Sequence, residues 1–368
     1  MSFSQIRGPL AHAVSNTYLE ARSLFLNTAT DLACEIQSYK NPHVTGINGE
    51  DLFCDVALYG AKHASKKIII SSGVHGVEAY CGSAMQILLM QQLMPHNIHK
   101  DIQLIFVHAI NPYGFSHYTR NNENNIDLNR NFIDFSKSRI ATEEETQFID
   151  EAYPEHWQSA DLTDILKTIN QYIEQRSWTD FQGKMTQGQY HWPQAPYFGG
   201  HTASWSNQVW REICAKHAKQ CNKLIHMDLH TGLGPKGACE LIYTGKPKNL
   251  ELTKKVFLNG EVIAPGSADS STPDISGPLC CGLLDCNPAA LCVALEFGTV
   301  PIDTMLSTVI EANWLYNNPD CAASLKAEIQ QKTLAAFFID EQQWLEDVWE
   351  KSKAYFDDAL QHLAEAES

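Results

Sequence analysis

The spacing of apolar residues predicts a chain in which helices and strands alternate. An N-terminal helix is predicted within about residues 15–40, where apolar side chains recur at helical spacing. Strands are predicted at 51–59 and at 66–72, where the run KKIIISS is typical of a strand buried in a sheet. The segment AYCGSAMQILLMQQL predicts an amphipathic helix that ends before Pro95, and the next strand is predicted at 102–109. This order is typical of a βαβ unit.

The second half of the chain predicts a return to strands. They are expected at 223–229, 240–244 and 291–297, with a terminal helix at about 339–365. Residues 111–114, NPYG, predict a turn directly after the earlier strand. An α/β fold follows from this order. In open α/β sheets, ligands collect beyond the carboxyl ends of the strands, so functional side chains are expected there.

Residues of about 136–222 differ in composition from the predicted strands around them. Acidic, helix-like segments lead into GKMTQGQYHWPQAPYFGGH, which is rich in aromatic residues, Gly, Pro and Gln. Long segments of this kind inside a compact domain are usually functional or disordered, and the aromatic residues of Tyr190–Phe198 argue against disorder. We interpret the segment as an insertion in a single domain that spans residues 1–368, and we expect it to form a wall of the substrate cleft.

Composition and charge restrict the kinds of partner. The formal charge of −16, from 43 acidic and 27 basic side chains, disfavours nucleic acid and anionic membrane surfaces. No stretch approaches the roughly 18 to 20 uninterrupted apolar residues of a membrane span, and the N-terminus lacks the apolar core of a signal peptide. We therefore expect a soluble, cytoplasmic protein that acts on a small molecule or peptide. The oligomeric state stays open.

The cysteines are expected to be free thiols. The chain has 11 of them, without paired CxxC spacing. Cys280, Cys281 and Cys286 form one local cluster, for which a structural role is favoured over metal or redox chemistry.

A metal site is suggested by His75 and Glu78, which stand three residues apart in the loop GVHGVE after the predicted strand 66–72. An HxxE pair by itself also occurs among ordinary surface residues. A catalytic zinc site needs a third nitrogen or oxygen ligand and an open position for water. Among the 15 histidines, His230 is the best candidate because it ends the strand-like segment KLIHMDLH and is followed by TGLG.

The alternation of His226, Asp228 and His230 leaves a second arrangement open. A period of 2 places the three side chains on one face of a strand, where they could form a site of their own. They would spread over about 13 Å along the strand, which is too far to share one tetrahedral ion. We therefore favour His230 as the ligand, Asp228 as a hydrogen-bond acceptor behind it, and His226 as a packing residue.

Two further segments carry polar groups that need an explanation. The segment TRNNENNIDLNRNF, Thr119–Phe132, is dense in Asn and Arg, and is either a solvated loop or a clamp for a carboxylate or oxyanion. The planar fork of arginine suits bidentate carboxylate binding, and Asn129 could add an amide donor. Glu296 closes the apolar strand CVAL, where an unpartnered acid is costly. Near a metal, a carboxylate there could take a proton from water.

Four short motifs, taken in their order along the sequence, resemble the zinc carboxypeptidase superfamily of the carboxypeptidase A type. This superfamily includes the succinylglutamate desuccinylase and aspartoacylase branch. HGVE resembles the metal pair of the family, DLNRNF its Asn-Arg pair, DLHTG the strand of the third ligand and LEFG its catalytic glutamate. The resemblance spans about residues 50–305. The segment NENNIDLNRNF resembles sequences of a bacterial branch rather than those of the digestive enzymes. The short spacing from Arg120 to Asn129 is similar to that of the acylase branch. The pocket tyrosine of the family has no assigned match.

The resemblance implies a fold and a cofactor. The fold would be a three-layer α/β sandwich with a central twisted mixed β-sheet flanked by helices. One Zn²⁺ per chain would be held by His75, Glu78 and His230. Glu296 would act as general base and then as general acid.

The resemblance also implies a substrate with a free carboxylate. Arg120 is similar in placement to the arginine that polarises the scissile carbonyl, and Asn129 and Arg130 match the pair that holds the carboxylate. Either a peptide with a free C-terminus or an N-acyl amino acid would satisfy this clamp. A catalytically silent metal- or peptide-binding protein is an alternative of another class, but a binder needs no base at Glu296. A serine hydrolase is disfavoured because no GxSxG motif is found.

Overall fold

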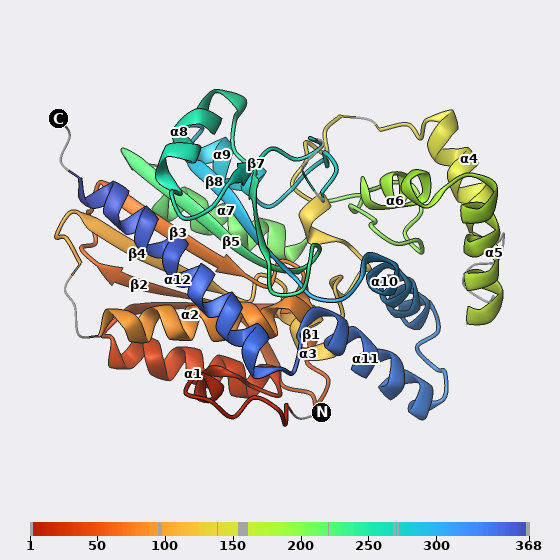
Figure 1. The fold of residues 1–368 in the computed structure, drawn as a ribbon, viewed down its shortest axis with the longest axis horizontal. Coiled ribbons are helices and arrows are strands. Elements are labelled where there is room, and N and C mark those ends of the chain that lie inside the picture. Colours follow the sequence, from red (N-terminus) through yellow and green to blue (C-terminus); the bar gives the residue numbers. More distant parts are fainter. Residues whose placement is uncertain are drawn as a thin grey trace.

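One eight-stranded sheet forms the centre of the molecule, with the strand order β1-β2-β4-β3-β5-β8-β6-β7 (Figure 1). The structure is a computed structural model that describes residues 3–94, 98–137, 139–153, 161–219, 221–267, 270 and 272–365. The strands are Glu35–Thr45 (β1), Asp51–Gly60 (β2), Lys66–Ser72 (β3), Ile102–His108 (β4), Lys223–Gly232 (β5), Cys239–Tyr243 (β6), Val262–Ile263 (β7) and Leu291–Gly298 (β8).

Helices lie on both faces and at one side of this sheet (Figure 1). They are Tyr18–Asp31 (α1), Ala79–Leu93 (α2), Pro112–His117 (α3), Glu143–Ala152 (α4), Leu162–Gln175 (α5), Trp178–Thr186 (α6), Trp205–His217 (α7), Leu250–Val256 (α8), Cys280–Cys286 (α9), Ile302–Asn317 (α10), Ala323–Phe337 (α11) and Gln342–Ala364 (α12).

The sheet is mixed, and its central strands run in parallel. β3 pairs in parallel with β4 and with β5, and β5 pairs in parallel with β8. β1, β2 and β6 are each antiparallel to a neighbour. Because β3 and β4 pair in parallel on either side of α2 in the chain, the predicted βαβ unit is confirmed. The carboxyl ends of β3, β5 and β8 consequently meet at one edge of the sheet.

Alternate strand positions build a separate apolar core on each face. On β3, Ile68 and Ile70 pack in the core that includes residues of α1, α2 and α12. Ile69, which points the other way, packs in the core that includes residues of α7 and α9. Helices therefore cover both faces of the sheet, and the predicted three-layer α/β sandwich is confirmed.

The helix α2 differs from the amphipathic helix that the sequence predicts. Its bounds agree, but every residue from Ala79 to Met90 is buried, polar Ser83 and Gln86 included. The reason is position, since α2 packs beside α1 and α12 over β3 and β4 and has little contact with solvent. Gln86 remains satisfied because its amide donates to the carbonyls of Ile70 and Val107 on those strands.

Two local predictions are wrong. The N-terminal helix ends at Asp31 rather than continuing to about residue 40, because Ala33 takes a positive φ of 56° and the chain then enters β1 at Glu35. The NPYG segment, predicted as a turn, begins helix α3. Asn111 caps it by accepting a hydrogen bond from the amide of Gly114, and the proline stands in the first turn, where its missing N–H costs nothing.

The segment of about 136–222 contains two kinds of structure. α4, α5 and α6 gather at one side of the sandwich, at the right of Figure 1. α7 instead packs on the sheet through Trp210 and Ile213, and so belongs to one of the covering layers. Residues 154–160 lie outside the described part of the chain. That the whole segment is an insertion in one domain stays a prediction.

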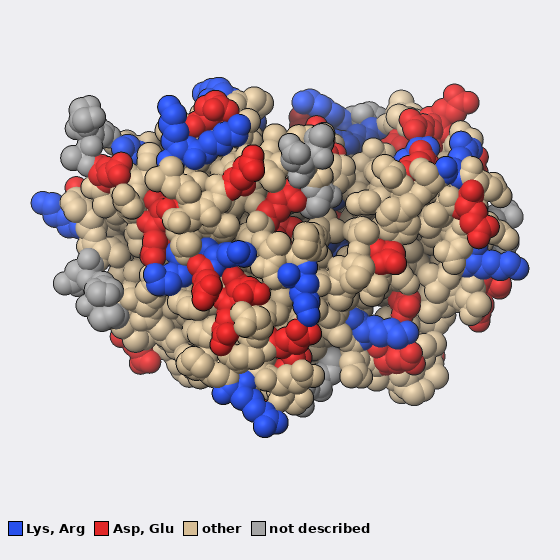
Figure 2. Space-filling view, in the orientation of Figure 1, with Lys and Arg blue, Asp and Glu red and all other residues tan. Residues whose placement is uncertain are grey.

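The surface of the described residues carries both signs of charge. On the face shown in Figure 2, lysine and arginine side chains lie scattered among aspartates and glutamates. Among the described residues, no helix has the length and apolar character needed to cross a membrane. The prediction that nucleic acid and membranes are not partners stays a prediction.

Candidate metal centre

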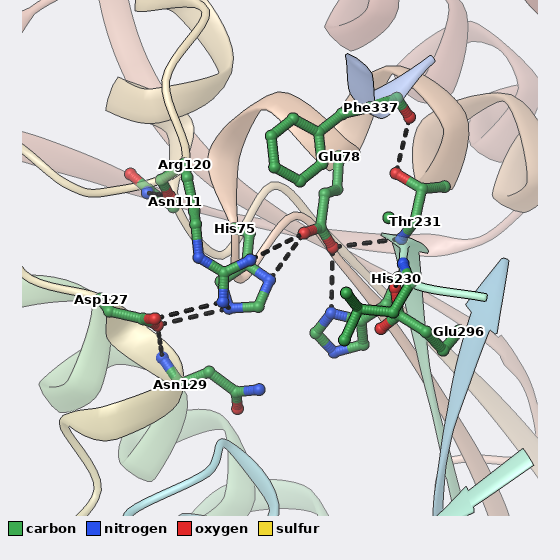
Figure 3. A network of polar contacts seen from close by, with 12 residues as sticks. His75, Glu78, Asn111, Arg120, Asp127, Asn129, His230, Thr231, Glu296 and Phe337 are labelled. Atoms are coloured by element: carbon green, nitrogen blue, oxygen red, sulfur yellow. Dashed lines mark hydrogen bonds and ion pairs between the residues drawn. The ribbon is translucent and has the colours of Figure 1, made fainter. Parts of the chain in front are cut away.

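His75, Glu78 and His230 meet at the edge where the parallel strands end (Figure 3). His75 lies on the loop after β3 and precedes a short 3-10 helix, Gly76–Glu78, whose last residue is the glutamate. His230 projects from β5, two residues before that strand ends at Gly232. All three side chains are buried.

The loop that carries His75 depends on close contact with a neighbouring segment. A Cβ at Gly76 would lie 2.2 Å from the backbone of Gly114, so a larger residue would push the two segments apart. The amide of Gly76 donates to the carbonyl of Arg120 at 3.0 Å, and the next amide donates to Thr119. These contacts place the Arg120 side chain beside His75.

The glutamate stands between the two histidines. Glu78 Oε1 lies 2.8 Å from His75 Nδ1, and Glu78 Oε2 lies 3.0 Å from His230 Nδ1. Oε2 also accepts a hydrogen bond from the amide of Thr231 at 3.2 Å. Each histidine therefore turns its Nδ1 toward the same small volume.

A carboxylate stands behind each histidine as well. His230 Nε2 lies 2.8 Å from Asp228 Oδ2, and His75 Nε2 lies 3.3 Å from Asp127 Oδ1. An imidazole that donates its Nε2 hydrogen to a carboxylate leaves the Nδ1 lone pair free for a metal. The expected position of Asp228 behind His230 is thus what the structure shows.

The charges of this cluster suit a cation. Burial raises the pKa of Glu78, but the adjacent His75 and His230 outweigh burial and lower the pKa to about 2. Burial lowers the pKa of His230, whereas the carboxylates of Asp228 and Glu78 on either side raise it well above its usual value. Glu78 is therefore ionised at neutral pH. A metal at His230 would replace the proton on Nδ1.

The donor set fits zinc. One ligand atom from each of His75, Glu78 and His230 lies within 4.8 Å of the others, and two imidazoles with one carboxylate are a standard catalytic zinc set. Within the described part of the chain, this is the one group of three His, Cys, Asp or Glu residues with that geometry. The cysteines at 280, 281 and 286 do not form a second one.

Glu296 lies on the strand next to His230. The two residues are direct partners in the parallel β5/β8 ladder, so their side chains share a face of the sheet. Glu296 Oε1 accepts a hydrogen bond from the amide of Leu233 at 2.9 Å. Burial and the negative charge of Glu78 raise the pKa of Glu296 to about 7. A carboxyl group with such a pKa can both accept and return a proton near neutrality.

Arg120 reaches into the cluster from the loop after α3. Its Nη1 donates to Glu78 Oε1 at 3.3 Å, and its Nη2 donates to Asp127 Oδ2 at 3.1 Å. Nη2 also lies 2.7 Å from His75 Nε2. That last contact requires His75 Nε2 to accept, whereas metal binding through Nδ1 requires it to donate to Asp127. We therefore expect Arg120 to move off this nitrogen when a metal is bound.

Asn129 and Arg130 lie beside this arginine, and some of their hydrogen-bonding groups already have partners within the protein. Asn129 Oδ1 accepts from the amide of Leu279 at 2.8 Å, so its amide nitrogen is the group left for a ligand. Arg130 donates through Nη1 to the carbonyl of Asn129 and through Nη2 to that of Thr186. Within the part of the chain that the structure describes, its Nε, like that of Arg120, has no hydrogen-bond partner. The structure thus brings all three predicted clamp residues to the site.

A cavity of about 380 Å³ opens from the ligands along the face of β5, β8 and β6. Its wall near His75 and His230 is charged, and its remaining wall is largely apolar. The apolar side chains belong to β6, α8, the loop before α9, and the helices α10 and α11; they include Ile242, Leu250, Pro265, Ile275, Leu279, Met305, Val309 and Phe337.

Residues that the sequence reasoning missed complete the site. Asp127 is fully buried and contacts His75, Arg120 and the backbone of Asn129. It begins the DLNRNF segment that contains the predicted residues Asn129 and Arg130, but no role was predicted for Asp127 itself. Tyr197 lies with its ring 5.3 Å from the Arg120 guanidinium and 5.6 Å from that of Arg130. The aromatic segment predicted as a cleft wall supplies it, but no local pattern marks this tyrosine among its aromatic neighbours.

Solved structures to which this chain is similar include carboxypeptidase A from Helicoverpa armigera, at 14% identity and a TM-score of 0.46, over 91% of this chain and 75% of that chain. They include succinylglutamate desuccinylase from Chromobacterium violaceum, at 13% identity and a TM-score of 0.39, over 81% and 74%. An aspartoacylase family protein from Mesorhizobium loti is similar at 15% identity and a TM-score of 0.40, over 77% and 67%.

No curated protein matches the sequence. A family match nevertheless covers most of the chain, from residue 14 to residue 351. The chain belongs to the family described as "Protein of unknown function (DUF2817)".

Proposed function

We propose that this protein is a zinc-dependent hydrolase that cleaves the amide bond of the C-terminal residue of a peptide, next to the free carboxylate. One observation carries the proposal: a buried His-Glu-His set has a carboxyl group, Glu296, on the adjacent strand. Ligands alone would also suit a structural or a binding site. A carboxyl group whose pKa is raised to about 7 beside them suits proton transfer in catalysis.

His75, Glu78 and His230 would hold the ion and, as three protein ligands, leave a position for water. When bound, zinc supplies a Lewis acid that polarises the substrate carbonyl and lowers the pKa of a bound water molecule to around 7. Asp228 accepts the Nε2 hydrogen of His230 and keeps that ring oriented. Asp127 would do the same for His75 once Arg120 has moved off His75 Nε2.

Glu296 moves the protons of the reaction. Its carboxylate takes a proton from the attacking water and then delivers it to the nitrogen of the departing amine, so that the amide bond breaks and a free amine leaves. Its remaining hydrogen bond, from the amide of Leu233, holds one carboxylate oxygen in place. The other oxygen is left for the proton transfer.

The substrate is recognised through the cationic wall of the cavity. Arg120 would stabilise the negative charge that develops on the carbonyl oxygen, while Asn129 and Arg130 bind the free carboxylate. The apolar remainder of the cavity favours a peptide whose last residue has a large apolar side chain. An N-acyl amino acid would use the same clamp, and is the alternative that a substrate panel separates.

Replacement of Glu296 by Gln tests the catalytic role. We expect Glu296→Gln to bind zinc as the wild type does and to lose about 10²- to 10⁴-fold in kcat, because the amide cannot accept the proton. Glu240→Gln is the matched control, since Glu240 is the cross-strand partner of Glu296 on β6. Full activity in Glu296→Gln, or a wild type without stoichiometric zinc after reconstitution, would contradict the proposal.

A panel of substrates tests recognition. Peptides with a free C-terminus, the same peptides with an amidated C-terminus, and N-acyl amino acids are compared by kcat/KM. We expect the free-carboxylate peptides to be the best substrates and amidation to abolish most of the activity. Equal rates for free and amidated peptides would exclude Asn129 and Arg130 as the clamp, and preference for N-acyl amino acids would identify a deacylase.

A further inference from the structure

A buried chain of hydrogen bonds leads away from His230 into the sheet. It runs from His230 through Asp228 and Ser71 to His226, and none of these residues is more than 4% exposed. We propose that Ser71 and His226 are positioning residues that orient Asp228, and through it His230, so that Nδ1 of His230 faces the metal. This inference rests on the proposed zinc site.

The strand register brings the chain together. Ser71 on β3 is the parallel partner of Asp228 on β5. Positions 226, 228 and 230 alternate with apolar Ile225, Met227 and Leu229, which belong to the core on the opposite face. The polar side chains are therefore stacked along one face of β5, with Ser71 alongside.

The direction of each hydrogen bond follows from what each group can donate. Ser71 Oγ lies 2.6 Å from Asp228 Oδ1, and a carboxylate only accepts, so the single hydroxyl hydrogen of Ser71 is used there. The 2.8 Å contact of Ser71 Oγ with His226 Nε2 must then be donated by the histidine. His226 donates to Ser71, and Ser71 donates to Asp228.

His226, at the far end of this series of hydrogen bonds, has the protonation that a donor to Ser71 needs. Burial lowers the pKa of His226 to about 4, so at neutral pH the ring is uncharged and carries one hydrogen. With that hydrogen on Nε2, Nδ1 is a bare acceptor. In agreement, Nδ1 has no partner among the described residues. A buried nitrogen without a hydrogen bond lowers the stability of the folded protein. Packing, the role expected for His226 from the sequence, therefore does not explain a histidine at this position.

Asp228, at the near end of this series of hydrogen bonds, determines which nitrogen of His230 carries the hydrogen. With Oδ1 of Asp228 occupied by Ser71, Oδ2 is the oxygen that faces His230 Nε2, at 2.8 Å. His230 therefore keeps its hydrogen on Nε2 and presents Nδ1 toward Glu78. Without Ser71, Asp228 could rotate about its side chain, and the ring of His230 would lose its fixed orientation.

The test compares two neighbouring serines. Ser71→Ala removes the link, whereas Ser72→Ala removes a serine of equal burial on the same strand that bonds to Gln86. Zinc affinity is measured by competition with a chelator, and melting of the metal-free protein is measured alongside. We expect Ser71→Ala to weaken zinc binding about 10- to 100-fold, and Ser72→Ala to leave it within about threefold, at similar losses of thermal stability.

A second pair of variants separates positioning from packing. The amide nitrogen of Gln in His226→Gln can take the place of Nε2 as a donor to Ser71, whereas His226→Leu fills the space without a donor. We expect Gln to retain zinc affinity near that of the wild type and Leu to lose it. Equal zinc affinity of Ser71→Ala and Ser72→Ala, or of the Gln and Leu variants, would overturn the inference while the proposed function stands. A wild type that binds no zinc would overturn both.

Discussion

At the scale of single residues, the site depends on groups that each have one defined role. Glu78 contacts both histidines and the backbone of Thr231, so one carboxylate joins the loop after β3 to the end of β5. Asp127 and Asp228 stand on the outer sides of the two rings. An apolar residue at position 78 would remove the partner that Glu78 supplies to Nδ1 of His230.

The protonation of His230 predicts how zinc affinity depends on pH. The neighbouring carboxylates raise its pKa well above the usual value, so zinc must displace one proton from Nδ1. Affinity is then lost as pH falls, and we expect the apparent affinity between pH 6 and pH 7 to change about tenfold per pH unit. Chelator competition at several pH values measures this. Affinity that is independent of pH over this range would contradict a proton on Nδ1 of His230 that zinc displaces.

At the scale of elements, the fit between the 3-10 helix Gly76–Glu78 and helix α3 positions the metal ligands. The two segments touch at Gly76 and Gly114, where no side chain fits between the backbones. The amides of Gly76 and Val77 donate to the carbonyls of Arg120 and Thr119. One contact therefore positions two groups, the HxxE pair and the arginine.

Replacement of Gly76 by Ala tests this contact. The added Cβ would lie 2.2 Å from Gly114 and must displace the loop, so we expect a loss of about 1–3 kcal/mol in the free energy of unfolding together with weakened zinc binding. Gly183→Ala in α6 is the control, because its Cβ would meet nothing within 4 Å. It should stabilise by about 0.5–1 kcal/mol, as expected for Gly to Ala within a helix. Unfolding in denaturant with and without zinc distinguishes these results.

At the scale of the whole molecule, packing on both faces of the sheet buries polar groups that water would otherwise solvate. His108 on β4 is fully buried, stacks on Phe25 and bonds through Nε2 to Ser83. Burial lowers its pKa to about 4. The fold therefore holds this histidine uncharged, while the unfolded chain lets it take up a proton.

This burial predicts a loss of stability in acid. Between about pH 6.5 and pH 4 the unfolded chain binds a proton at position 108 and the folded protein does not, so stability falls as pH falls, by up to about 1.4 kcal/mol per pH unit. His108→Gln should reduce that slope, while His63→Gln on the exposed surface should leave it unchanged. Unfolding free energies of the metal-free proteins at pH 7, 6 and 5 measure it. An unchanged slope in His108→Gln would contradict the assignment.

The parts of the fold that could be predicted are those with a local signature. The β-branched run at 66–72, the strand at 291–297 and the terminal helix are marked by spacing within a few residues. The end of α1 and the start of α3 could not be predicted from such spacing. A single positive φ at Ala33 ends the first helix, and a cap by Asn111 begins the second. The burial of α2 depends on helices that arrive from both ends of the chain.

The residue types near the ends of the strands can be read from the chain alone: they are His75, Glu78, His230 and Glu296, with Arg120, Asn129 and Arg130 beside them. Which of these side chains meet, and which groups lie behind them, depends on the folded molecule. Asp127 faces His75, and Ser71 joins His226 to Asp228 across 155 and 157 residues of chain. The physical reason is that strand order and register set such contacts, and these depend on the packing of the whole sheet rather than on any local pattern.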